Sequence, residues 1–587
     1  MACLALAGLL AGSTGDASGS HVAVAAKRAT APSLFVSPSG NDAGRCAKSA
    51  PCASWNRAYQ LAQPGQVIEV AGGSYPGQTI DPRPALRGKS CSLAERSKCV
   101  TFVPATGAHV SINGDLVVTG SDVYVKGTAR PASGVPTRSR TFDISVAGYT
   151  SAEATAEETW PDHVVLEGID TANFAVGGAD DVVLRNMDVG PSTADFSGSC
   201  RGLENRVGLN GASSHEARNV VLDGLFVHNQ NRTRAAADND CHYGGMILIS
   251  GSGITLRNSV FSQNVVYNIQ IQNFVGSPAS NVRIENNWFG CPVGQLFEPN
   301  GPTTCNEQRD LQFSSAARFA NWLIRYNSFG GGIGQYNPGE TYANVRIVGN
   351  VGIGPTYNLC QPGITFAYNA WVGGQECTKK DVFLHAPPFQ SDTPGAENFS
   401  LKPGTRAAGL VTGKGADYTL PLDIAGQLRP AHAAPDAGAS QRETAALELA
   451  RSIGEASLGA KRADVRGFYG RPRASRTLKV AAVGALRVEQ YRAHGGSLLV
   501  TYDGDRVVGL STDSAYYATP DGFGPGSPVK GAATLRGGKW IDCGRPAFRK
   551  VVGGAVVYFV TAPTRRTVSA ISLVLRKYDE DCLSKPS

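Results

Sequence analysis

The stretch NVRIENNWF, residues 281–289, decides the fold of this chain, because its pattern recurs along the sequence. Each copy is a short run of aliphatic and β-branched residues that follows Asn, Asp or Gly and leads into a turn. The copies begin about 18 to 40 residues apart, and such spacing predicts a solenoid of stacked coils. The other copies are HVVLEGI (163–169), DVVLRNMDV (181–189), NVVLDGLFV (219–227), GITLRNSVF (253–261), NWLIRYNSF (321–329), NVRIVGNVG (344–352) and GITFAYNAW (363–371).

Two columns of side chains emerge when the copies are aligned. Equivalent residues of successive coils stack over one another in a solenoid. We therefore expect Asn side chains at one turn position to hydrogen-bond from coil to coil, and aromatic side chains at another to fill the interior. The Asn column is Asn287, Asn327, Asn350 and Asn369, and the aromatic column is Phe261, Phe289, Phe329 and Trp371. Their recurrence indicates a structural role.

The composition agrees with a globular protein of many short strands. The chain has 587 residues, of which 42% are hydrophobic and 70 are Gly, and its formal net charge is +7. It is long enough for two or more domains. The excess of basic residues falls in the C-terminal quarter and is spread out, so we expect no nucleic-acid partner.

The N-terminal residues 1–26 contain a short apolar run that ends in AVAA, and they resemble a signal peptide. Residues 27–33 are then a linker. The run is too short to span a membrane, and we expect no other span.

The cysteines also favour an exported protein, because twelve of the thirteen fall into pairs of near neighbours. None of these pairs has the spacing of a zinc site. The predicted disulfides are Cys46–Cys52, Cys91–Cys99, Cys200–Cys241, Cys291–Cys305, Cys360–Cys377 and Cys543–Cys582.

Residues 34–80 predict a strand, a polar turn, a short helix around Trp55–Leu61 and a strand within VIEVAGGSY (67–75). This segment and the repeats resemble the N-terminal cap and coils of right-handed parallel β-helix proteins of the pectate-lyase-like superfamily. NFSLKPGTRAAG (398–409) and LPLDIAGQLRPAHAAPDAGA (420–439) resemble their last coil. The resemblance covers residues 34–441 and implies an all-β, right-handed parallel β-helix solenoid. The same fold hosts lyases, hydrolases, epimerases and inert surface proteins.

Residues 442–587 are expected to form a small α+β domain. RPAHAAPDAGASQRETAALE (429–448) predicts a linker that runs into a helix. ASLGAKRADVRGFYGRP (456–472) and the strand-like residues after it resemble the βLIP-like repeat of β-lactamase inhibitory proteins, with Lys461 where Ser or Thr is commoner. GFGPGSP (522–528) opens a second copy, which the hairpin VVYFVTAPTRRTVSAISLVL (556–575) closes. The resemblance implies a binding or assembly module with a protein or the cell wall as partner; the alternative is that the domain is only a structural appendage.

Three long insertions follow repeat strands, at residues 188–218, 228–243 and 290–310. They leave equivalent positions, so we expect them to emerge on one side as a wall above a groove. Cys200–Cys241 would join the first to the second. The second contains DNDCHYGG (238–245), which is either a disulfide-stapled turn or part of a ligand-binding or catalytic loop.

Ionisable residues are concentrated in these insertions. Cleavage of an acidic polysaccharide by β-elimination needs a cation for the uronate carboxylate, a base for the proton beside it and a donor for the leaving oxygen. A hydrolase needs two carboxylates instead, and Ca²⁺ needs several oxygen ligands. The candidate catalytic residues are Arg234, Asp238, Asp240 and His242, of which Asp238 and Asp240 are also candidate calcium ligands; the candidate substrate-binding residues are Arg206, His228, Arg232, Glu298, Arg309 and Asp310.

Two functions stay open at this point. The first is a secreted protein that binds and cleaves a polysaccharide, as a lyase or a glycoside hydrolase, with calcium as the candidate cofactor. The second is a non-catalytic secreted or cell-surface protein that uses the solenoid for binding or support. The first is the leading hypothesis because of the fold resemblance. The second is the alternative, and its support is that the sequence carries no intact catalytic motif of the family; it also has no G-x-S-x-G elbow and no phosphate loop.

Overall fold

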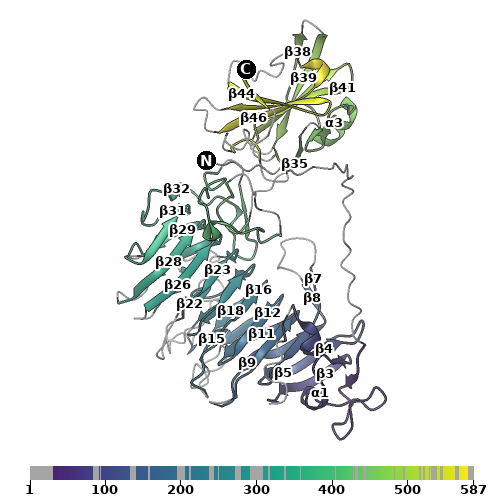
Figure 1. The fold of residues 1–587 in the computed structure, drawn as a ribbon, viewed down its shortest axis with the longest axis vertical. Helices are drawn as coiled ribbons and strands as arrows, with labels where there is room; N and C mark the ends of the chain where they lie inside the picture. Colours follow the sequence, from purple (N-terminus) through teal and green to yellow (C-terminus); the bar gives the residue numbers. More distant parts are fainter. Residues whose placement is uncertain are drawn as a thin grey trace, which may run out of the picture.

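The computed structural model describes most of the chain and consists mainly of strands (Figure 1). The described residues are 31–83, 91–92, 94–131, 140–156, 159–194, 205–209, 213–233, 235–236, 244–248, 250–271, 279–290, 309–314, 318–335, 339–356, 359–402, 405–426, 429, 434–440, 445–449, 451–480, 483–493, 496–514, 517–519, 523–527, 529, 538–542, 546–561 and 567–579.

The first sheet, which we call sheet A, has twelve parallel strands in the order in which the chain makes them. The repeats lie in register, so that Ile284 is aligned with Ile324, and Ile324 with Ile347. The strands are β1 (Leu34–Val36), β2 (Val67–Val70), β4 (Val100–Pro104), β6 (Val123–Lys126), β10 (Asp162–Glu167), β12 (Asp180–Arg185), β16 (Val221–Asp223), β20 (Thr255–Arg257), β23 (Arg283–Glu285), β26 (Arg318–Arg325), β28 (Thr341–Val348) and β30 (Ile364–Ala367).

The second sheet, sheet B, has sixteen strands, and the apolar side chains of both sheets meet in one core. Five long strands run through both halves of sheet B: β3 (Gly73–Ile80), β5 (Val110–Val118), β9 (Ile144–Glu153), β11 (Ile169–Gly177) and β27 (Ser328–Gln335). Strand β29 (Val351–Thr356) also pairs with both halves of β27. The short strands of the first half are β13 (Asp188–Val189), β17 (Phe226–His228), β21 (Val260–Ser262), β24 (Trp288–Phe289), β31 (Ala370–Val372) and β32 (Val382–Leu384). Those of the second half are β15 (Arg206–Gly208), β19 (Met246–Leu248), β22 (Ile269–Ile271) and β25 (Arg309–Phe313). This strand order is that of a parallel β-helix, so the predicted fold class is confirmed.

The Asn column is a hydrogen-bonded ladder inside the turn that follows sheet A. Nδ2 of Asn287 donates to Oδ1 of Asn327 at 2.9 Å, and the same contact links Asn327 to Asn350 and Asn350 to Asn369 at 3.0 Å. The ladder ends at Asp381, whose Oδ1 accepts from Nδ2 of Asn369 at 3.1 Å. All four amides are fully buried. A carboxylate can close the ladder because it accepts hydrogen bonds without having to donate one.

Three of the four residues of the predicted aromatic column stack on one another. The ring centroids of Phe261 and Phe289 are 5.1 Å apart, and those of Phe289 and Phe329 are 5.0 Å apart. Gly352 occupies the next level, between Phe329 and Trp371. A Cβ at Gly352 would lie 2.6 Å from the Cβ of Phe329, so only Gly fits there.

Residues 389–440, which we call the strap, do not form the last coil that the sequence predicts. The last parallel strand is β32, and the strap then begins with an antiparallel pair, β33 (Phe389–Ser391) and β34 (Asn398–Leu401). It packs along the outside of earlier coils: Oγ of Ser440 accepts from Nε1 of Trp288 at 2.8 Å, and Nη2 of Arg429 donates to Oδ1 of Asn286 at 2.8 Å. The Pro- and Gly-rich sequence cannot supply a regular coil, but it supplies apolar side chains for this surface.

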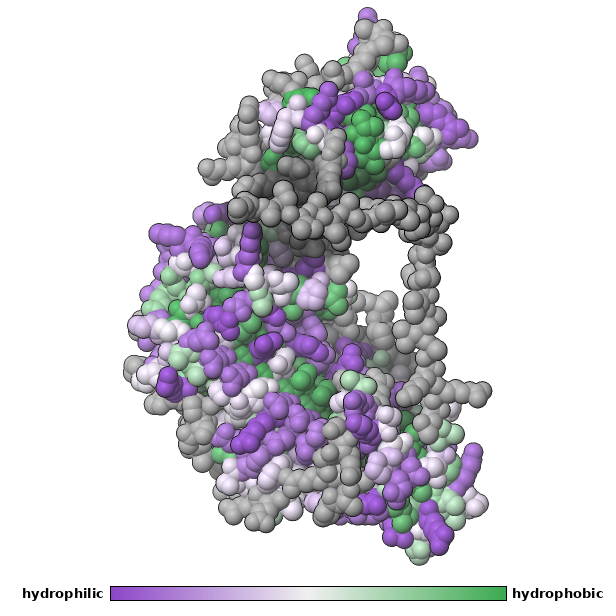
Figure 2. Space-filling model, in the orientation of Figure 1, coloured by the Kyte–Doolittle hydropathy of each residue, from purple (hydrophilic) through white to green (hydrophobic). Residues whose placement is uncertain are grey.

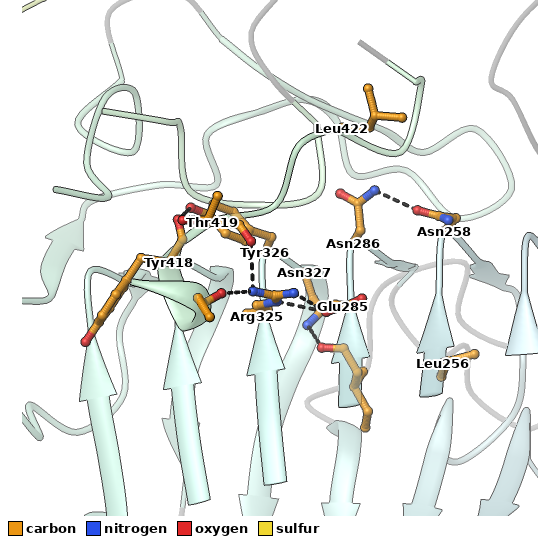
Figure 3. A network of polar contacts seen from close by, with 12 residues as sticks. Leu256, Asn258, Glu285, Asn286, Arg325, Tyr326, Asn327, Tyr418, Thr419 and Leu422 are labelled. Carbon is orange, nitrogen blue, oxygen red and sulfur yellow. Dashed lines mark hydrogen bonds and ion pairs between the residues drawn. The ribbon is translucent and has the colours of Figure 1, made fainter. Parts of the chain in front are cut away.

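The strap also lies over a buried ion pair. Nη2 of Arg325 is 2.7 Å from Oε2 of Glu285, and the two side chains are only 8% and 7% exposed. Nη1 of Arg325 donates to the carbonyl oxygens of Ala416 and Thr419 in the strap (Figure 3). The hydroxyl of Tyr326 donates to the carbonyl oxygen of Tyr418 at 2.7 Å. Polar groups therefore fix the position of the strap at its inner side.

The eighth position of the repeats shows what the strap covers. In spatial order this outer column reads Asp170, Asp188, Phe226, Val260, Trp288, Ser328, Val351 and Ala370. The column is mainly apolar where it packs against strap residues such as Phe399 and Ile424, and its one polar member there, Ser328, accepts the backbone N–H of Ala439 of the strap at 3.1 Å. It becomes acidic in the earlier coils. The strap thus covers the mainly apolar stretch of this column.

Other local predictions can be compared with the structure. The helix α1 (Trp55–Leu61) is confirmed, with Oγ of Ser54 accepting the backbone N–H of Arg57 at its start. The disulfides Cys46–Cys52, Cys91–Cys99 and Cys360–Cys377 are confirmed. The pairs Cys200–Cys241, Cys291–Cys305 and Cys543–Cys582 lie outside the described residues, as do the signal peptide and most of the predicted linker after it.

The C-terminal residues form an antiparallel sheet of eight strands, sheet C, which contains two successive four-stranded meanders. In spatial order its strands are β38 (Ala474–Val480), β39 (Gly484–Ala493), β40 (Gly496–Asp503), β41 (Arg506–Thr512), β46 (Val568–Leu575), β45 (Ala555–Thr561), β44 (Pro546–Val552) and β43 (Lys539–Asp542). The hairpin predicted within residues 556–575 is confirmed as β45–β46. The βLIP-like identity of the domain stays a prediction.

The predicted helix after the linker is wrong. Ala445–Glu448 is strand β35, which pairs with β36 (Ser452–Ile453) and β42 (Tyr517–Ala518). Ala, Leu and Glu favour helix locally, but pairing with two strands outweighs this preference. Helix α3 (Arg462–Tyr469) lies further along this domain, and its Val465 is buried in the core of the domain. In the described part of the chain, no helix has the length and apolar composition needed to cross a membrane.

Candidate functional site

The three insertions leave strands in one half of sheet B and enter its other half. They connect β13 to β15, β17 to β19 and β24 to β25, and the strands that they enter lie in the order β25, β22, β19, β15. The prediction that they leave equivalent positions is therefore confirmed by the strand order. The first and second insertions also begin as a parallel pair, β14 (Ser192–Ala194) with β18 (Gln230–Arg232).

Several predicted site residues lie in the insertions themselves. Arg234, Asp238, Asp240, His242 and Glu298 lie outside the described residues, so their roles stay predictions. Arg309 begins β25, next to β22. The loop that contains Asp238 and His242 leads into β19, and Ile247 of β19 is aligned with Arg206 of β15.

Arg206 belongs to a group of ionisable side chains on the outer face of sheet B. Its Nη2 is 3.6 Å from Oε2 of Glu153 on β9, and the two side chains are 34% and 15% exposed. Asp115 of β5 lies beside them and accepts the backbone N–H of Tyr149 at 3.0 Å. We call Asp115, Tyr149, Glu153 and Arg206 the arginine–carboxylate cluster.

The environment of the arginine–carboxylate cluster shifts two of its acids in the same direction. Burial raises the pKa of Glu153, and the charge of Asp115 adds to this, although the charge of Arg206 opposes it. Burial and the charges of Glu153 and Asp115 also raise the pKa of Tyr149. A carboxyl with a raised pKa exchanges protons closer to neutral pH than an ordinary glutamate does.

His228 is held at both ring nitrogens. Its Nε2 lies 2.8 Å from Oδ1 of Asp188, and its Nδ1 lies 2.7 Å from Oδ1 of Asn229. The ring stacks on Phe226 with centroids 4.3 Å apart. Burial alone would lower the pKa of His228, but the hydrogen bond and charge of Asp188, with Asn229 and Asp170, raise it. An imidazolium held at both nitrogens is better suited to binding a ligand or stabilising the coil than to transferring a proton.

The raised pKa of His228 predicts a pH dependence of stability. A histidine whose pKa is raised by folding stabilises the folded state fully below its unfolded pKa, and this contribution is lost as the pH rises through the folded pKa. The free energy of unfolding should therefore fall more in the wild type than in His228→Gln between roughly pH 6 and pH 9. Denaturant unfolding at a series of pH values measures this difference. An identical decline in both proteins would contradict it.

Two predicted substrate-binding residues occupy different environments. Asp310 is fully buried, and its oxygens accept from Nδ2 of Asn268 at 2.7 Å and from the backbone N–H of Gly331 at 2.6 Å. Burial raises its pKa well above the ordinary value. These contacts favour a role for Asp310 in fixing the coil. Arg232 ends β18, where it is aligned with Ala194 of the first insertion.

The structure adds acidic residues that the sequence analysis did not single out. Glu153 contacts Arg206, while Asp170 and Asp188 are neighbours in the outer column. Burial and the charge of Asp188 raise the pKa of Asp170. The aligned repeats contained a signal for this pair, because the two Asp residues share the eighth position with Phe226 and Trp288. Glu153 has no such signal, since it lies outside the aligned copies.

One further group of donors lies at the turns that lead into sheet A. Asp162, His163 and Asp181 place one donor atom each within 4.8 Å of one another. Nδ1 of His163 is 2.8 Å from Oδ1 of Asp162, and burial raises the pKa of Asp162. This group belongs to β10 and β12 and not to the strands that carry Arg206.

Comparisons with known proteins assign the chain to no family. No protein-family model matches the chain, and no curated protein matches it. Among solved structures, the chain is similar to the pectate lyase Pel9A (14% identity, 70% of this chain, 97% of that chain, TM-score 0.40). It is also similar to an alginate lyase from Paenibacillus sp. str. FPU-7 (13%, 53%, 93%, 0.29) and to PfbA, a surface adhesin of Streptococcus pneumoniae (10%, 54%, 79%, 0.31). At these values the fold assignment rests on the strand order of sheets A and B.

Proposed function

We propose that this protein binds an acidic polysaccharide along the outer face of β9, β11 and β15 and cleaves it by β-elimination. The observation that carries the proposal is the arginine–carboxylate cluster. It sets a partly exposed guanidinium beside a carboxyl and a phenol with raised pKa values. Arg206 lies on β15, which the first insertion enters, and the neighbouring strand β19 is the one that the second insertion enters.

Arg206 would bind the carboxylate of a uronate residue. Arginine matches a carboxylate with two parallel hydrogen bonds, and this pairing neutralises the charge that opposes loss of the neighbouring proton. A substrate carboxylate at Arg206 would also replace Glu153 as its partner. Glu153 would then be free to accept a proton.

The chemical step needs one base and one acid. Glu153 would take the proton from the carbon beside the uronate carboxylate, a carbon–carbon double bond would form, and the glycosidic carbon–oxygen bond would break. The hydroxyl of Tyr149 would protonate the leaving oxygen and would later be reprotonated through solvent. The products are one chain with a new reducing end and one chain with an unsaturated uronate end.

Two further features belong to the proposal. Asp238 and Asp240 stay candidate ligands for calcium, which would add positive charge at the uronate. We also propose that the protein is exported, because the three disulfides found are typical of proteins from oxidising compartments.

The proposal is tested by turnover of the purified, oxidised protein on acidic and neutral polysaccharides, with and without Ca²⁺. Ultraviolet absorbance would detect unsaturated ends, and a reducing-sugar assay would detect all new ends. Reducing ends without unsaturation would identify a hydrolase instead. Binding without either product would support the non-catalytic function.

Arg206→Gln should lower kcat/KM for unsaturated product by about 100-fold, because removal of one charge-stabilising donor typically costs that much. Arg206→Lys should keep part of the activity, since a point charge replaces the planar fork. Arg283→Gln is the matched control, because Arg283 is an exposed arginine on sheet A. Steady-state kinetics on the best substrate measure all three variants. Equal activity of wild type and Arg206→Gln would contradict the role of Arg206.

A further inference from the structure

The segment 461–492 of the C-terminal domain is strongly basic. It contains nine Lys or Arg residues and two carboxylates, whereas the whole chain is nearly balanced, with 55 Lys or Arg and 48 Asp or Glu. The segment comprises α3, β38 and most of β39, so it forms one edge of sheet C and the helix beside it. We call this surface the basic edge.

Both carboxylates of the basic edge are already engaged. Glu489 is fully buried, and its Oε1 is 2.6 Å from Nη2 of Arg462, 2.6 Å from Nη2 of Arg466 and 3.1 Å from Nε of Arg487. Although burial opposes the shift, these contacts lower the pKa of Glu489 to about 2. Asp464 accepts the backbone N–H of Lys461 at the start of α3. One buried carboxylate shared by three guanidinium groups leaves an excess of positive charge.

Five further cations of the basic edge are exposed and make no ion pair within the described part of the chain: Arg471, Arg473, Arg476, Lys479 and Arg492. They lie on or beside β38, the outermost strand of sheet C. Figure 2 shows hydrophilic residues gathered around α3 in this domain. So many like charges repel one another unless a polyanion binds there.

A hollow of about 330 Å³ adjoins these cations. Polar side chains line most of it, namely Ser475, Arg476, Gln490, Ser497 and Asp513. Asp513 accepts the backbone N–H of Ser497 at 2.7 Å, and Arg492 is the cross-strand partner of Ser497. Hydroxyl, amide and carboxylate groups beside a guanidinium are the partners that sugar hydroxyls need.

We propose that the basic edge and its hollow form a second binding site, which takes an acidic polysaccharide. The cations bind the carboxylate or sulfate groups of the polymer, and the hollow receives a sugar unit. A single-stranded nucleic acid would need a row of stacking aromatic side chains. A membrane would need a flat basic surface, whereas Arg476 and Lys479 project from opposite faces of β38. The site does not depend on catalysis at Arg206.

The test is binding of the full chain to polygalacturonate, measured by sedimentation or titration calorimetry. Arg206→Gln serves as the host, so that proposed cleavage does not consume the polymer. Into this host we would introduce four changes on the basic edge or four on the solenoid, all at exposed cations. The test set is Arg471→Gln, Arg473→Gln, Arg476→Gln and Lys479→Gln, and the control set is Lys126→Gln, Arg218→Gln, Arg283→Gln and Arg318→Gln.

The test set should weaken binding at least about tenfold, and the control set should leave it nearly unchanged. Binding should also fall with added salt and be absent for neutral dextran. Equal weakening by both sets would overturn the proposal, as would equal binding of dextran. Tighter binding of duplex DNA or of vesicles with phosphatidylglycerol would assign the surface to another partner. If Arg206→Gln loses turnover but still binds polygalacturonate, that result bears only on the proposed function of Arg206 and leaves the second binding site supported.

Discussion

Glu285→Ala should lower the free energy of unfolding by about 3–5 kcal/mol, because it leaves a buried guanidinium without its carboxylate. The Glu285–Arg325 pair is almost inaccessible to water, with Nε and Nη2 of Arg325 at 2.8 and 2.7 Å from the same carboxylate oxygen. Arg325 also donates to the strap at Ala416 and Thr419 (Figure 3). Loss of Glu285 should therefore loosen the strap as well as the coil.

Denaturant unfolding and limited proteolysis of the strap would measure the effect of Glu285→Ala. The matched control is Asp417→Ala, which removes a pair with Arg346 in which both side chains are 31% exposed. Such a pair contributes about 1 kcal/mol or less. The double variant Glu285→Ala with Arg325→Met should recover part of the loss, since it removes the unpaired charge. A cost for Glu285→Ala no larger than that of the control would refute this interpretation.

Asn327→Leu should cost roughly 4 kcal/mol, because it interrupts the Asn ladder in a fully buried turn. Oδ1 of Asn327 accepts from both the backbone N–H and Nδ2 of Asn287, at 3.0 and 2.9 Å. Its Nδ2 donates to the carbonyl oxygen of Ile284 at 2.8 Å. Its Nδ2 also donates to Oδ1 of Asn350 at 3.0 Å. Leucine has a similar shape, so the change removes these four buried hydrogen bonds and creates little extra space.

Thermal and denaturant unfolding would measure the cost of Asn327→Leu, and hydrogen exchange would show whether neighbouring coils open first. The control is Asn321→Ala, since Asn321 stacks on Asn281 at the opposite turn but is exposed. Water can replace its contact, so a smaller loss is expected even though its φ of 59° favours Asn. Equal losses at both positions would mean that burial of the ladder contributes nothing.

Repetition is what made the fold predictable. The Asn ladder and the aromatic column follow from residues that recur at fixed positions, and stacking of coils converts that recurrence into contacts. The short disulfides Cys46–Cys52 and Cys91–Cys99 were predictable for a similar reason, because residues so close in the chain are also close in space. Local propensity failed at Ala445–Glu448, where strand pairing replaces the predicted helix.

The strap and the arginine–carboxylate cluster were harder to predict, because both depend on contacts between distant parts of the chain. Trp288 and Ser440 are 152 residues apart, and no repeat links them. Arg206 was predicted as a substrate-binding residue from its place in an insertion. Its partner Glu153 comes from a strand two places away in sheet B, and the sequence carries no sign of that neighbour.

The strap also fixes an order of events during synthesis. Phe226, Val260 and Trp288 are made long before the strap residues that pack against them. Synthesis proceeds from the N-terminus, and early domains fold as they appear. The nascent solenoid must therefore carry an uncovered apolar ridge until residue 440 has been added, and such a ridge promotes association between growing chains. The strap is the last part of the solenoid to be made, and by covering this ridge it prevents self-association of the growing chains.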